Sequence, residues 1–342
     1  MIVLVEDNCR DNLFPFTATR HVADILVGAL TLRQKWEMLT GEKVSTNKND
    51  TGIYIPANII ATPQNFKEII KKCADNISIE ETETIKKINY PWHIYQLNDY
   101  ALRQDFELLT KNKKSIPLPE TNNAVSGENI FIEEGALISH STFNAATGPI
   151  YISAGTQIME GCTIRGPFFI GNNSIAKMGS KIYGATSIGA NCIVGGEIKN
   201  SVLFGNSNKA HDGYLGDSVL GEWCNLGAGT SNSNVKNNAG NVGYIMEKNA
   251  PPIYAGNKAG LLMGDYSRAA INTSFNTGSI VGVCCNIFGE IMPPKFTESF
   301  TWGKEKYIFD KALRDIENWM AFKNKSLTET DKQKLKELYE KI

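Results

Sequence analysis

A polar segment in the second half of the chain holds the side chains best suited to chemistry. Residues 209–214 include His211 and Tyr214, and Asn225 and Asn234 follow in the same stretch. An imidazole titrates near neutral pH, so a histidine here can act as a general base that removes a proton from a nucleophile. The alternative is that His211 only makes hydrogen bonds in a loop, which is the commoner role of a lone histidine.

A six-residue repeat builds the elements that must position this segment. Aliphatic or other apolar residues recur at this spacing in two series: Ile152, Ile158, Ile164, Ile170, Ala176, Ile182, Ile188 and Val194, then Met263, Ala269, Phe275, Val281 and Ile287. This period fits neither a helix nor a hairpin array, and it is typical of a parallel β-helix. Each hexad supplies one short strand with an inward apolar residue and one corner, and three hexads complete a coil that is stabilised by its neighbours.

The repeat is interrupted near His211. Counting by sixes from Val194 predicts inward residues at 200, 206 and 212, whereas the later units lie at 214, 220 and 226. We therefore expect residues 200–213 to form a loop that bulges from the stack of coils, which we call the shaft. Loops on a rigid scaffold often carry function. The stretch 235–258 also lacks hexads and predicts a longer excursion, whose role the sequence does not indicate.

The two ends of the chain lack hexads. The first 115 residues predict strands at Ile2–Val5 and Ile53–Ile55 and helices over Val22–Trp36, Phe66–Cys73 and Pro91–Phe106. After Pro293-Pro294 we expect the repeat to end, with helices over 306–323 and 328–341. The predicted organisation is a small α/β domain at 1–115, a β-helix at 124–292 and a helical extension at 293–342.

Composition excludes several classes of protein. The chain has 342 residues and a formal net charge of -1, so no global field favours nucleic acid or a membrane surface. Its seven cysteines form no C-x-x-C pair, which favours a reduced, cytoplasmic compartment. Neither a signal peptide nor a membrane-spanning run is expected. Only His140 and His211 fall within the repeats, so we expect no metal site.

The residues around His211 carry a family resemblance. The chain reads Lys209-Ala210-His211-Asp212-Gly213-Tyr214-Leu215-Gly216-Asp217, then Asn225-Leu226-Gly227-Ala228-Gly229-Thr230. These segments resemble K-A-G-H-x-x-Y-L-G-D and N-I-G-A-G-T in the acetyltransferase half of the bifunctional GlmU family, N-acetylglucosamine-1-phosphate uridyltransferase/glucosamine-1-phosphate acetyltransferase. The resemblance implies a mainly β fold, a left-handed parallel β-helix with a small N-terminal α/β domain and C-terminal helices.

The resemblance also implies residue roles. It makes His211 the general base, while Tyr214 and Asn225 contact an amino-sugar phosphate. It makes Ala228 and Asn234 contacts of acetyl-coenzyme A. Tyr214 could instead be plain packing, and Asn225 could belong to a ladder of stacked asparagines. Backbone N–H groups at Gly227–Gly229 are expected to stabilise the oxyanion of the reaction.

Two lysines are the expected phosphate ligands. The resemblance implies that Lys199 binds the phosphate, and Lys181 lies eighteen residues earlier, where we expect it to stack one coil away and share that role. The family also has a lysine in a loop after the downstream asparagine, which Lys236 or Lys248 would replace here. The family forms trimers with each site at a seam between subunits, and Trp223 is expected to pack between subunits.

The first domain resembles the start of sugar nucleotidyltransferases over Leu13–Arg20. The glycine-rich loop that cradles nucleotide phosphates in those enzymes is missing, because Leu4–Arg10 contains no glycine. Arg20 and Asp105 are the candidate residues for nucleotidyl transfer, which would also require Mg²⁺.

Three functions remain open from the sequence. The first is an acetyl-coenzyme A-dependent N-acetyltransferase that acts on an amino-sugar phosphate or nucleotide sugar. The second is a sugar-1-phosphate nucleotidyltransferase in which the β-helix serves for trimerisation. The third is a non-enzymatic scaffold that binds sugar nucleotides.

Overall fold

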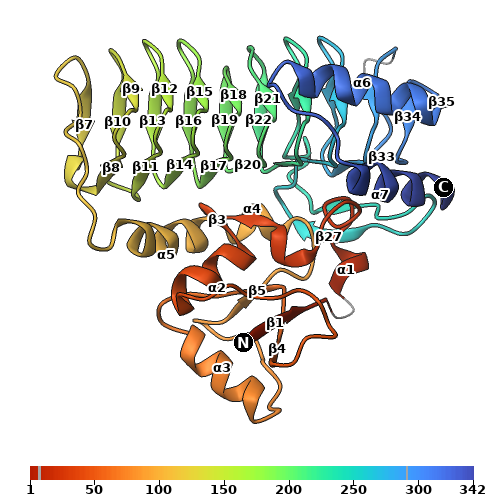
Figure 1. Cartoon of the computed structure of the whole chain (residues 1–342). Helices are drawn as coiled ribbons and strands as arrows, with labels where there is room; N and C mark the ends of the chain where they lie inside the picture. The colour runs from red at the N-terminus through yellow and green to blue at the C-terminus, as the bar shows by residue number, and fades with distance from the viewer. Residues whose placement is uncertain (7–8, 290–291) are drawn as a thin grey trace.

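A three-sided parallel β-helix forms most of the molecule (Figure 1). The computed structural model describes residues 1–6, 9–289 and 292–342. Figure 1 shows the coils stacked in a row, with the N-terminal region against one side and helices α6 and α7 at one end of the stack. This confirms the parallel β-helix that the six-residue repeat predicts.

Each side of the prism is a sheet. The nine-stranded face contains β8 (Ile130–Ile132), β11 (Ile150–Ile152), β14 (Phe168–Ile170), β17 (Thr186–Ile188), β20 (Val202–Leu203), β23 (Val219–Leu220), β28 (Leu261–Met263), β31 (Ser279–Val281) and β33 (Phe296–Thr297). The ten-stranded face contains β9 (Leu137–Ile138), β12 (Gln157–Ile158), β15 (Ile175–Ala176), β18 (Ile193–Val194), β21 (Asn208–Lys209), β24 (Asn225–Leu226), β29 (Arg268–Ala269), β32 (Asn286–Ile287), β34 (Thr301–Trp302) and the antiparallel β35 (Glu305–Lys306).

The third side is shorter. The six-stranded face contains β7 (Asn123–Val125), β10 (Thr142–Asn144), β13 (Thr163–Arg165), β16 (Lys181–Tyr183), β19 (Glu197–Lys199) and β22 (Tyr214–Gly216). A separate pair follows it, β25 (Ser231–Asn232) and β30 (Ser274–Phe275). Between β22 and β25, side chains take over from the backbone ladder: Ser231 Oγ accepts the Tyr214 N–H at 3.0 Å and Asn232 Oδ1 accepts the Gly216 N–H at 2.9 Å.

The inward residues form one hydrophobic core along the shaft. Every member of the two predicted six-residue series is buried in it, from Ile152 to Val194 and from Met263 to Ile287. Each fully buried aliphatic side chain contributes roughly 1.5–3 kcal/mol, so the repeat itself holds the coils together. Consecutive coils are paired in register, as in Ile150↔Phe168 and Ile152↔Ile170.

The predicted loop at 200–213 is wrong. The shaft is not interrupted there, because the coils simply become shorter: Ile198 pairs with Ile182, sixteen residues earlier, and Lys209 pairs with Val194, fifteen residues earlier. The coils are shortened at their corners, for example at the tight turn Gly195-Gly196 between β18 and β19. Gly196 has a φ of +71°, which a glycine adopts without strain.

The repeat also continues beyond residue 292, where the sequence led us to end it. Strand β33 pairs with β31 and β34 pairs with β32, so both add to faces of the shaft. Helices α6 (Phe309–Ala321) and α7 (Glu329–Glu340) then cover this end, close to the predicted helical ranges. Trp223, which we expected to pack between subunits, is buried in the hydrophobic cluster that these helices form with the shaft of the same chain.

The N-terminal region is a small α/β unit. Strand β1 (Ile2–Val5) pairs in parallel with β4 (Ile53–Pro56). The other elements are α1 (Cys9–Asn12), η1 (Val22–Asp24), β2 (Leu26–Val27), β3 (Leu30–Thr31), α2 (Leu32–Thr40), β5 (Ile59–Ile60), α3 (Phe66–Ala74), β6 (Lys86–Lys87), α4 (His93–Gln96) and α5 (Asn98–Thr110). The helices predicted over 22–36 and 91–106 are therefore each divided. Gly28 makes the β2–β3 turn at a φ of +73°, which breaks the first of them.

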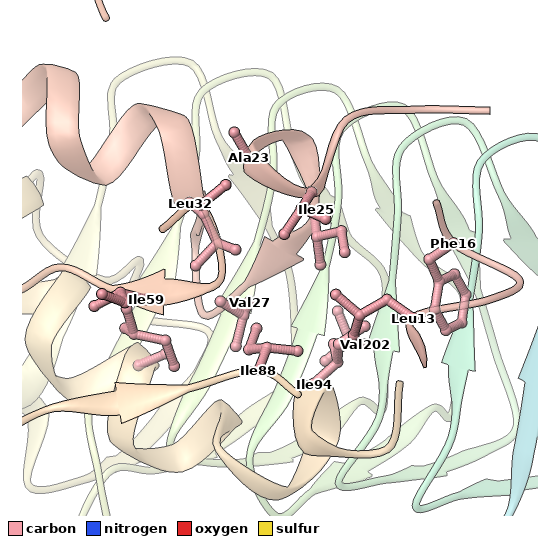
Figure 2. Packing of buried hydrophobic residues seen from close by; sticks show 14 of the residues in the cluster. Leu13, Phe16, Ala23, Ile25, Val27, Leu32, Ile59, Ile88, Ile94 and Val202 are labelled. Carbon is pink, nitrogen blue, oxygen red and sulfur yellow. The ribbon is translucent and has the colours of Figure 1, made fainter. Parts of the chain in front are cut away.

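This region is joined to the nine-stranded face by a continuous hydrophobic core. Figure 2 shows Leu13 and Phe16 beside Val202 of β20, with Ile94 of α4 close by. All four side chains are fully buried. Because the apolar surface of the N-terminal region is shared with the shaft, the two parts stabilise each other.

The 235–258 excursion, predicted to leave the shaft, holds the N-terminal region. It folds as an antiparallel hairpin of β26 (Val242–Tyr244) and β27 (Ile253–Gly256). The Tyr244 ring stacks on Trp92 with centroids 5.2 Å apart and an interplanar angle of 9°. Gln96 Nε2 donates to the Ala255 carbonyl at 2.8 Å. The excursion is thus a clamp over α4, which gives it a structural role that the sequence did not reveal.

Candidate functional site

His211 lies on an exposed edge of the prism. It occupies the corner 210–213 between β21 on the ten-stranded face and β22 on the six-stranded face. His211 and Asp212 are both exposed. Among the residues that the structure describes, the His211 ring has no hydrogen-bond or ion-pair partner, so Asp212 does not orient it as a side-chain acceptor. The imidazole is free to accept a proton from a molecule bound at this edge.

The corner of the next coil touches this one. The Gly229 N–H donates to the Asp212 carbonyl at 3.0 Å, which sets residues 227–230 directly beside residues 210–213. The Gly227 N–H is also occupied, because it donates to the Ala269 carbonyl at 2.9 Å. Of the three N–H groups expected to form an oxyanion hole, only that of Ala228 has no acceptor among the described residues. Ala228 is exposed, so this N–H remains available to a ligand.

Strand register arranges the charged side chains of the six-stranded face in two rows. In the strand register Lys181 lies opposite Glu197, and Glu197 lies opposite Tyr214, so these three residues form one row. Tyr183 pairs with Lys199, which belongs to the other row. The expected stacking of Lys181 on Lys199 is therefore wrong, because the coil that joins them is two residues shorter than eighteen. Both lysines still lie on the same face, on neighbouring strands.

The second row contains a cation that sequence reasoning missed. Arg165 ends β13, and the in-register pairing of β13 with β16 sets it opposite Tyr183. Arg165 is exposed, and Lys199 Nζ lies 5.7 Å from the centre of the Tyr183 ring. A hollow of about 290 Å³ on this face is lined by Arg165 and Tyr183 among others. No spacing rule could have found Arg165, since the coils between it and Lys199 differ in length.

Glu197, which lies between Lys181 and Tyr214 on this face, already accepts a hydrogen bond. Glu197 Oε1 accepts the Tyr183 hydroxyl at 2.6 Å, and this hydrogen bond, together with burial, raises the pKa of Tyr183 to about 12. Arg165, Lys181 and Lys199 have no carboxylate within salt-bridge distance among the described residues. The face therefore offers three cations to an anionic group such as a phosphate.

Tyr214 is held by a polar chain that begins at a buried aspartate. Asp217 accepts hydrogen bonds from Asn234 Nδ2 and, at 2.6 Å, from Asn200 Nδ2. Asn234 Nδ2 also donates to the Tyr214 hydroxyl oxygen at 3.1 Å. Burial, with Asp217 and Glu197 nearby, raises the pKa of Tyr214, so the phenol keeps its proton. Since its oxygen already accepts from Asn234, that proton can be donated to a ligand.

Asn225 is not brought to this site within one chain. It lies in β24 on the ten-stranded face, where Asn208 Nδ2 donates to its Oδ1 at 3.4 Å. This is the asparagine ladder that the sequence left open as an alternative. Lys323, from the segment after α6, reaches Asn208 at 3.4 Å and covers the ladder.

Comparisons with known proteins agree with the resemblance of the His211 segment. Bifunctional protein GlmU of Methanococcus maripaludis strain C5 is 27% identical over 79% of this chain. That of Methanocaldococcus jannaschii is 28% identical over 66% of the chain. A bifunctional sugar-1-phosphate nucleotidylyltransferase/acetyltransferase of Sulfurisphaera tokodaii is 30% identical over 59%. The chain is related to the GlmU proteins. It spans only 63%, 49% and 44% of the lengths of these three relatives.

The N-terminal region of this chain also matches a family model. The family described as sugar nucleotidyl transferase covers residues 2–50 and 47–114. Among solved structures, a UDP-N-acetylglucosamine acyltransferase aligns with 59% of this chain and 76% of its own, at 11% identity and a TM-score of 0.19. The fold is therefore assigned from the strand pairing of the chain itself.

Neither lysine that was expected to replace the GlmU loop lysine reaches the six-stranded face. Lys248 Nζ lies 3.5 Å from Glu298, in the turn between β33 and β34. Lys236 Nζ donates to the Asn241 carbonyl within the excursion. Both belong to the clamp over the N-terminal region, and the cations that the site does have are Arg165, Lys181 and Lys199.

Arg20 and Asp105, the two candidates for nucleotidyl transfer in the N-terminal region, both form ion pairs within the chain. Arg20 forms ion pairs with Asp265 and, at 3.3 Å, with Glu222, and its guanidinium lies 4.9 Å from the centre of the Phe204 ring. Its partners are all on the shaft. Arg20 therefore fastens the region to the β-helix.

Asp105 is occupied in a different way. Its carboxylate pairs with Lys35, both side chains are almost fully buried, and it also accepts the Ala29 N–H at 2.8 Å. It thus anchors the β2–β3 turn to α5. Within the described ranges no group of three His, Cys, Asp or Glu side chains is placed to hold a metal ion, and no helix is long and apolar enough to cross a membrane.

Proposed function

We propose that this protein is an acetyl-coenzyme A-dependent N-acetyltransferase that acts on an amino-sugar phosphate or a nucleotide sugar. One observation carries the proposal: on an exposed edge, next to a face with three cations, a histidine ring and a backbone N–H lie side by side without partners among the described residues. Base, oxyanion donor and phosphate ligands are the groups that this reaction requires. The kinship with bifunctional nucleotidyltransferase/acetyltransferase proteins supports the same class of transferase.

The chemistry follows from the placement of these groups. The acceptor amine attacks the thioester carbonyl, a carbon–nitrogen bond forms, and His211 removes the amine proton. The Ala228 N–H stabilises the oxyanion that develops on the carbonyl oxygen. The carbon–sulfur bond then breaks, and the coenzyme A thiolate leaves and takes up a proton, which His211 can return.

The acceptor is held through its phosphate. Lys181, Lys199 and Arg165 supply the positive charge, and the Tyr214 hydroxyl donates a hydrogen bond to the sugar phosphate. Because Lys181 and Tyr214 lie in one row that leads to the His211 corner, a sugar bound along this row extends its amine toward the imidazole. Acetyl-coenzyme A then occupies the edge at Ala228. Asn234, which holds the Tyr214 hydroxyl, lies between the acceptor and acetyl-coenzyme A and contacts the latter.

We place the complete site at a seam between subunits of a homotrimer, in the cytoplasm. Each chain presents His211 and Ala228 on an exposed edge. A neighbouring subunit would supply the second wall of a pantetheine channel. It would also be the source of an Asn225 contact, which a single chain does not bring to Tyr214.

A thiol-release assay tests the proposal. The protein is incubated with acetyl-coenzyme A and each of a panel of amino sugars, beginning with glucosamine-1-phosphate and UDP-glucosamine, and free thiol is measured. We expect acceptor-dependent release, and a loss of about 10²–10⁴-fold in the His211→Ala variant. His140→Ala, a histidine on another part of the shaft, is the matched control and keeps full activity. Release that is unchanged in His211→Ala would remove His211 as the base.

Nucleotidyl transfer is the second candidate, because residues 2–114 match the sugar nucleotidyl transferase family. Pyrophosphate release from UTP, Mg²⁺ and a sugar-1-phosphate tests it. We expect no release, since Arg20 and Asp105 are held in internal ion pairs and the region lacks a glycine-rich phosphate loop. Tight binding of a nucleotide sugar without either reaction would instead favour the scaffold hypothesis.

A further inference from the structure

Lys209 is a charged residue inside the shaft. It pairs in register with Val194 of the preceding coil, at a position where the inward residue is otherwise apolar, and Leu226 occupies the equivalent place in the following coil. Its side chain is only 1% exposed. The structure thus contains one buried ammonium group directly behind the corner that carries His211.

The ammonium is bound to the backbone of two corners. Lys209 Nζ donates to the His211 carbonyl and, at 3.2 Å, to the Gly195 carbonyl of the preceding coil. The His211 carbonyl therefore points to a donor inside the prism, while the imidazole of the same residue is exposed outside it. No other side chain among the described residues makes a hydrogen bond to the His211 backbone.

The neighbouring coils pack closely against this corner. A Cβ atom on Gly196 would lie 2.7 Å from the His211 carbonyl oxygen, and one on Gly213 would lie 2.1 Å from the Thr230 carbonyl oxygen. Both contacts are too close for a side chain. The corner 210–213 is thus packed between the glycine turn before it and the Thr230 corner after it, and Lys209 fixes its centre.

We propose that Lys209 is a positioning residue for His211: by binding the His211 carbonyl from inside the shaft, it holds the backbone that aims the imidazole. This rests on the proposed acetyl transfer, and it names a residue that acts through His211 rather than on the substrate. The imidazole has no side-chain partner of its own in the described chain. Its position consequently depends on the backbone of the corner, which Lys209 holds from inside the shaft and the Gly229 N–H holds from the next coil.

Packing alone does not account for a lysine at this position. A leucine or methionine would fill the interior without taking an ammonium group out of water, as the neighbouring coils do. Burial lowers the pKa of Lys209 to about 8, and the charge of Asp212 on the same corner only partly opposes this. The lysine is therefore an unfavourable interior residue by itself, and its two carbonyl acceptors are what distinguish it from an aliphatic one.

The experiment compares Lys209→Met with Leu203→Met, a volume-conserving change at another inward position of the shaft. Amide hydrogen exchange is measured at Glu197 and Gly229, whose N–H groups donate to the Gly213 and Asp212 carbonyls of the corner. In addition, kcat and KM are measured for acetyl transfer. In Lys209→Met we expect faster exchange at the corner and a kcat lower by about tenfold to a hundredfold, with little change in either KM, because a base displaced by about 1 Å costs rate rather than binding. Leu203→Met should change neither the exchange nor the kinetic constants.

Lys209→Gln provides a second variant in case Lys209→Met does not fold. Its amide keeps a donor of shorter reach, so exchange and kcat should fall between those of Lys209→Met and the unmodified protein. Unchanged exchange at Glu197 and Gly229 in both variants would show that Lys209 does not hold the corner. Faster exchange with an unchanged kcat, in a protein that His211→Ala inactivates, would show that the corner needs no such support. If the unmodified protein acetylates no acceptor, the proposed function fails, and the exchange data still decide whether Lys209 holds the corner.

Discussion

The N-terminal region and the His211 edge treat their polar groups in opposite ways. In the N-terminal region, Arg20 is paired with Asp265 and Glu222, and Asp105 is buried against Lys35. At the His211 edge, the imidazole and the Ala228 N–H have no partners in the described chain. In the first region these charged groups form ion pairs within the chain, and the second leaves potentially reactive groups open to a ligand.

This difference, more than family membership, is the reason that we assign the proposed acetyl transfer to the His211 edge. The N-terminal region matches a sugar nucleotidyl transferase family, yet its candidate residues fasten it to the shaft and stabilise its own turn. A buried ion pair serves structure, because releasing either partner for a substrate would leave the other charge uncompensated. We therefore expect substitutions in the two regions to affect different properties: stability in the first and acetyl transfer in the second.

The largest expected effect on stability is that of Asp105→Asn. Removing the carboxylate leaves the Lys35 ammonium buried without a counter-charge, which should lower the free energy of unfolding by about 3–5 kcal/mol. Urea denaturation measures this, and acetyl transfer per folded molecule should not change. Asp99→Asn is the control, since its pair with Arg103 on α5 lies at the surface and contributes little. An Asp105→Asn protein as stable as the unmodified one, or selectively inactive, would contradict the structural role.

The sequence predicts the shaft well because its core obeys a simple period. Each member of the series from Ile152 to Val194 is buried, since an inward residue must be apolar in every coil of constant length. The same rule fails at Lys209, because a lysine at an inward position looks like a break in the pattern. The shorter coils that put it there are visible only once strands pair.

The candidate site was only partly predictable for the same reason. His211 and Tyr214 stand out through their local motif, which does not depend on coil length. Arg165 and the relation of Lys181 to Lys199 do depend on it, because a difference of two residues changes which side chains share a row. Asn225 shows a further limit, since a motif gives the order of residues and not the face of the prism on which each lies.

The next effect in size concerns the clamp, the 235–258 excursion that holds the N-terminal region on the shaft. Tyr244 is fully buried against Trp92, so Tyr244→Ala should cost about 3 kcal/mol and loosen the N-terminal region. Limited proteolysis within residues 1–115 should become faster, while acetyl transfer continues. Tyr254→Ala, in the same hairpin but 64% exposed, is the matched control and should have little effect. Loss of acetyl transfer with no change in proteolysis would show that the excursion belongs to the active site.

The smallest expected effect separates the two regions by removing one hydroxyl from each. Tyr214→Phe deletes the donor that we assign to the sugar phosphate, and should raise the KM for the acceptor by about tenfold, the equivalent of one hydrogen bond to a charged group, with kcat little changed. Tyr100→Phe removes a hydroxyl that donates to the Thr84 carbonyl at 2.7 Å in the N-terminal region. It should lower stability by about 1 kcal/mol and leave KM unchanged. Steady-state kinetics at varied acceptor concentration, with thermal unfolding of both variants, measures this. Equal effects of the two substitutions on KM would mean that the N-terminal region also contributes to acceptor binding, and the division between a supporting region and a reactive edge would not hold.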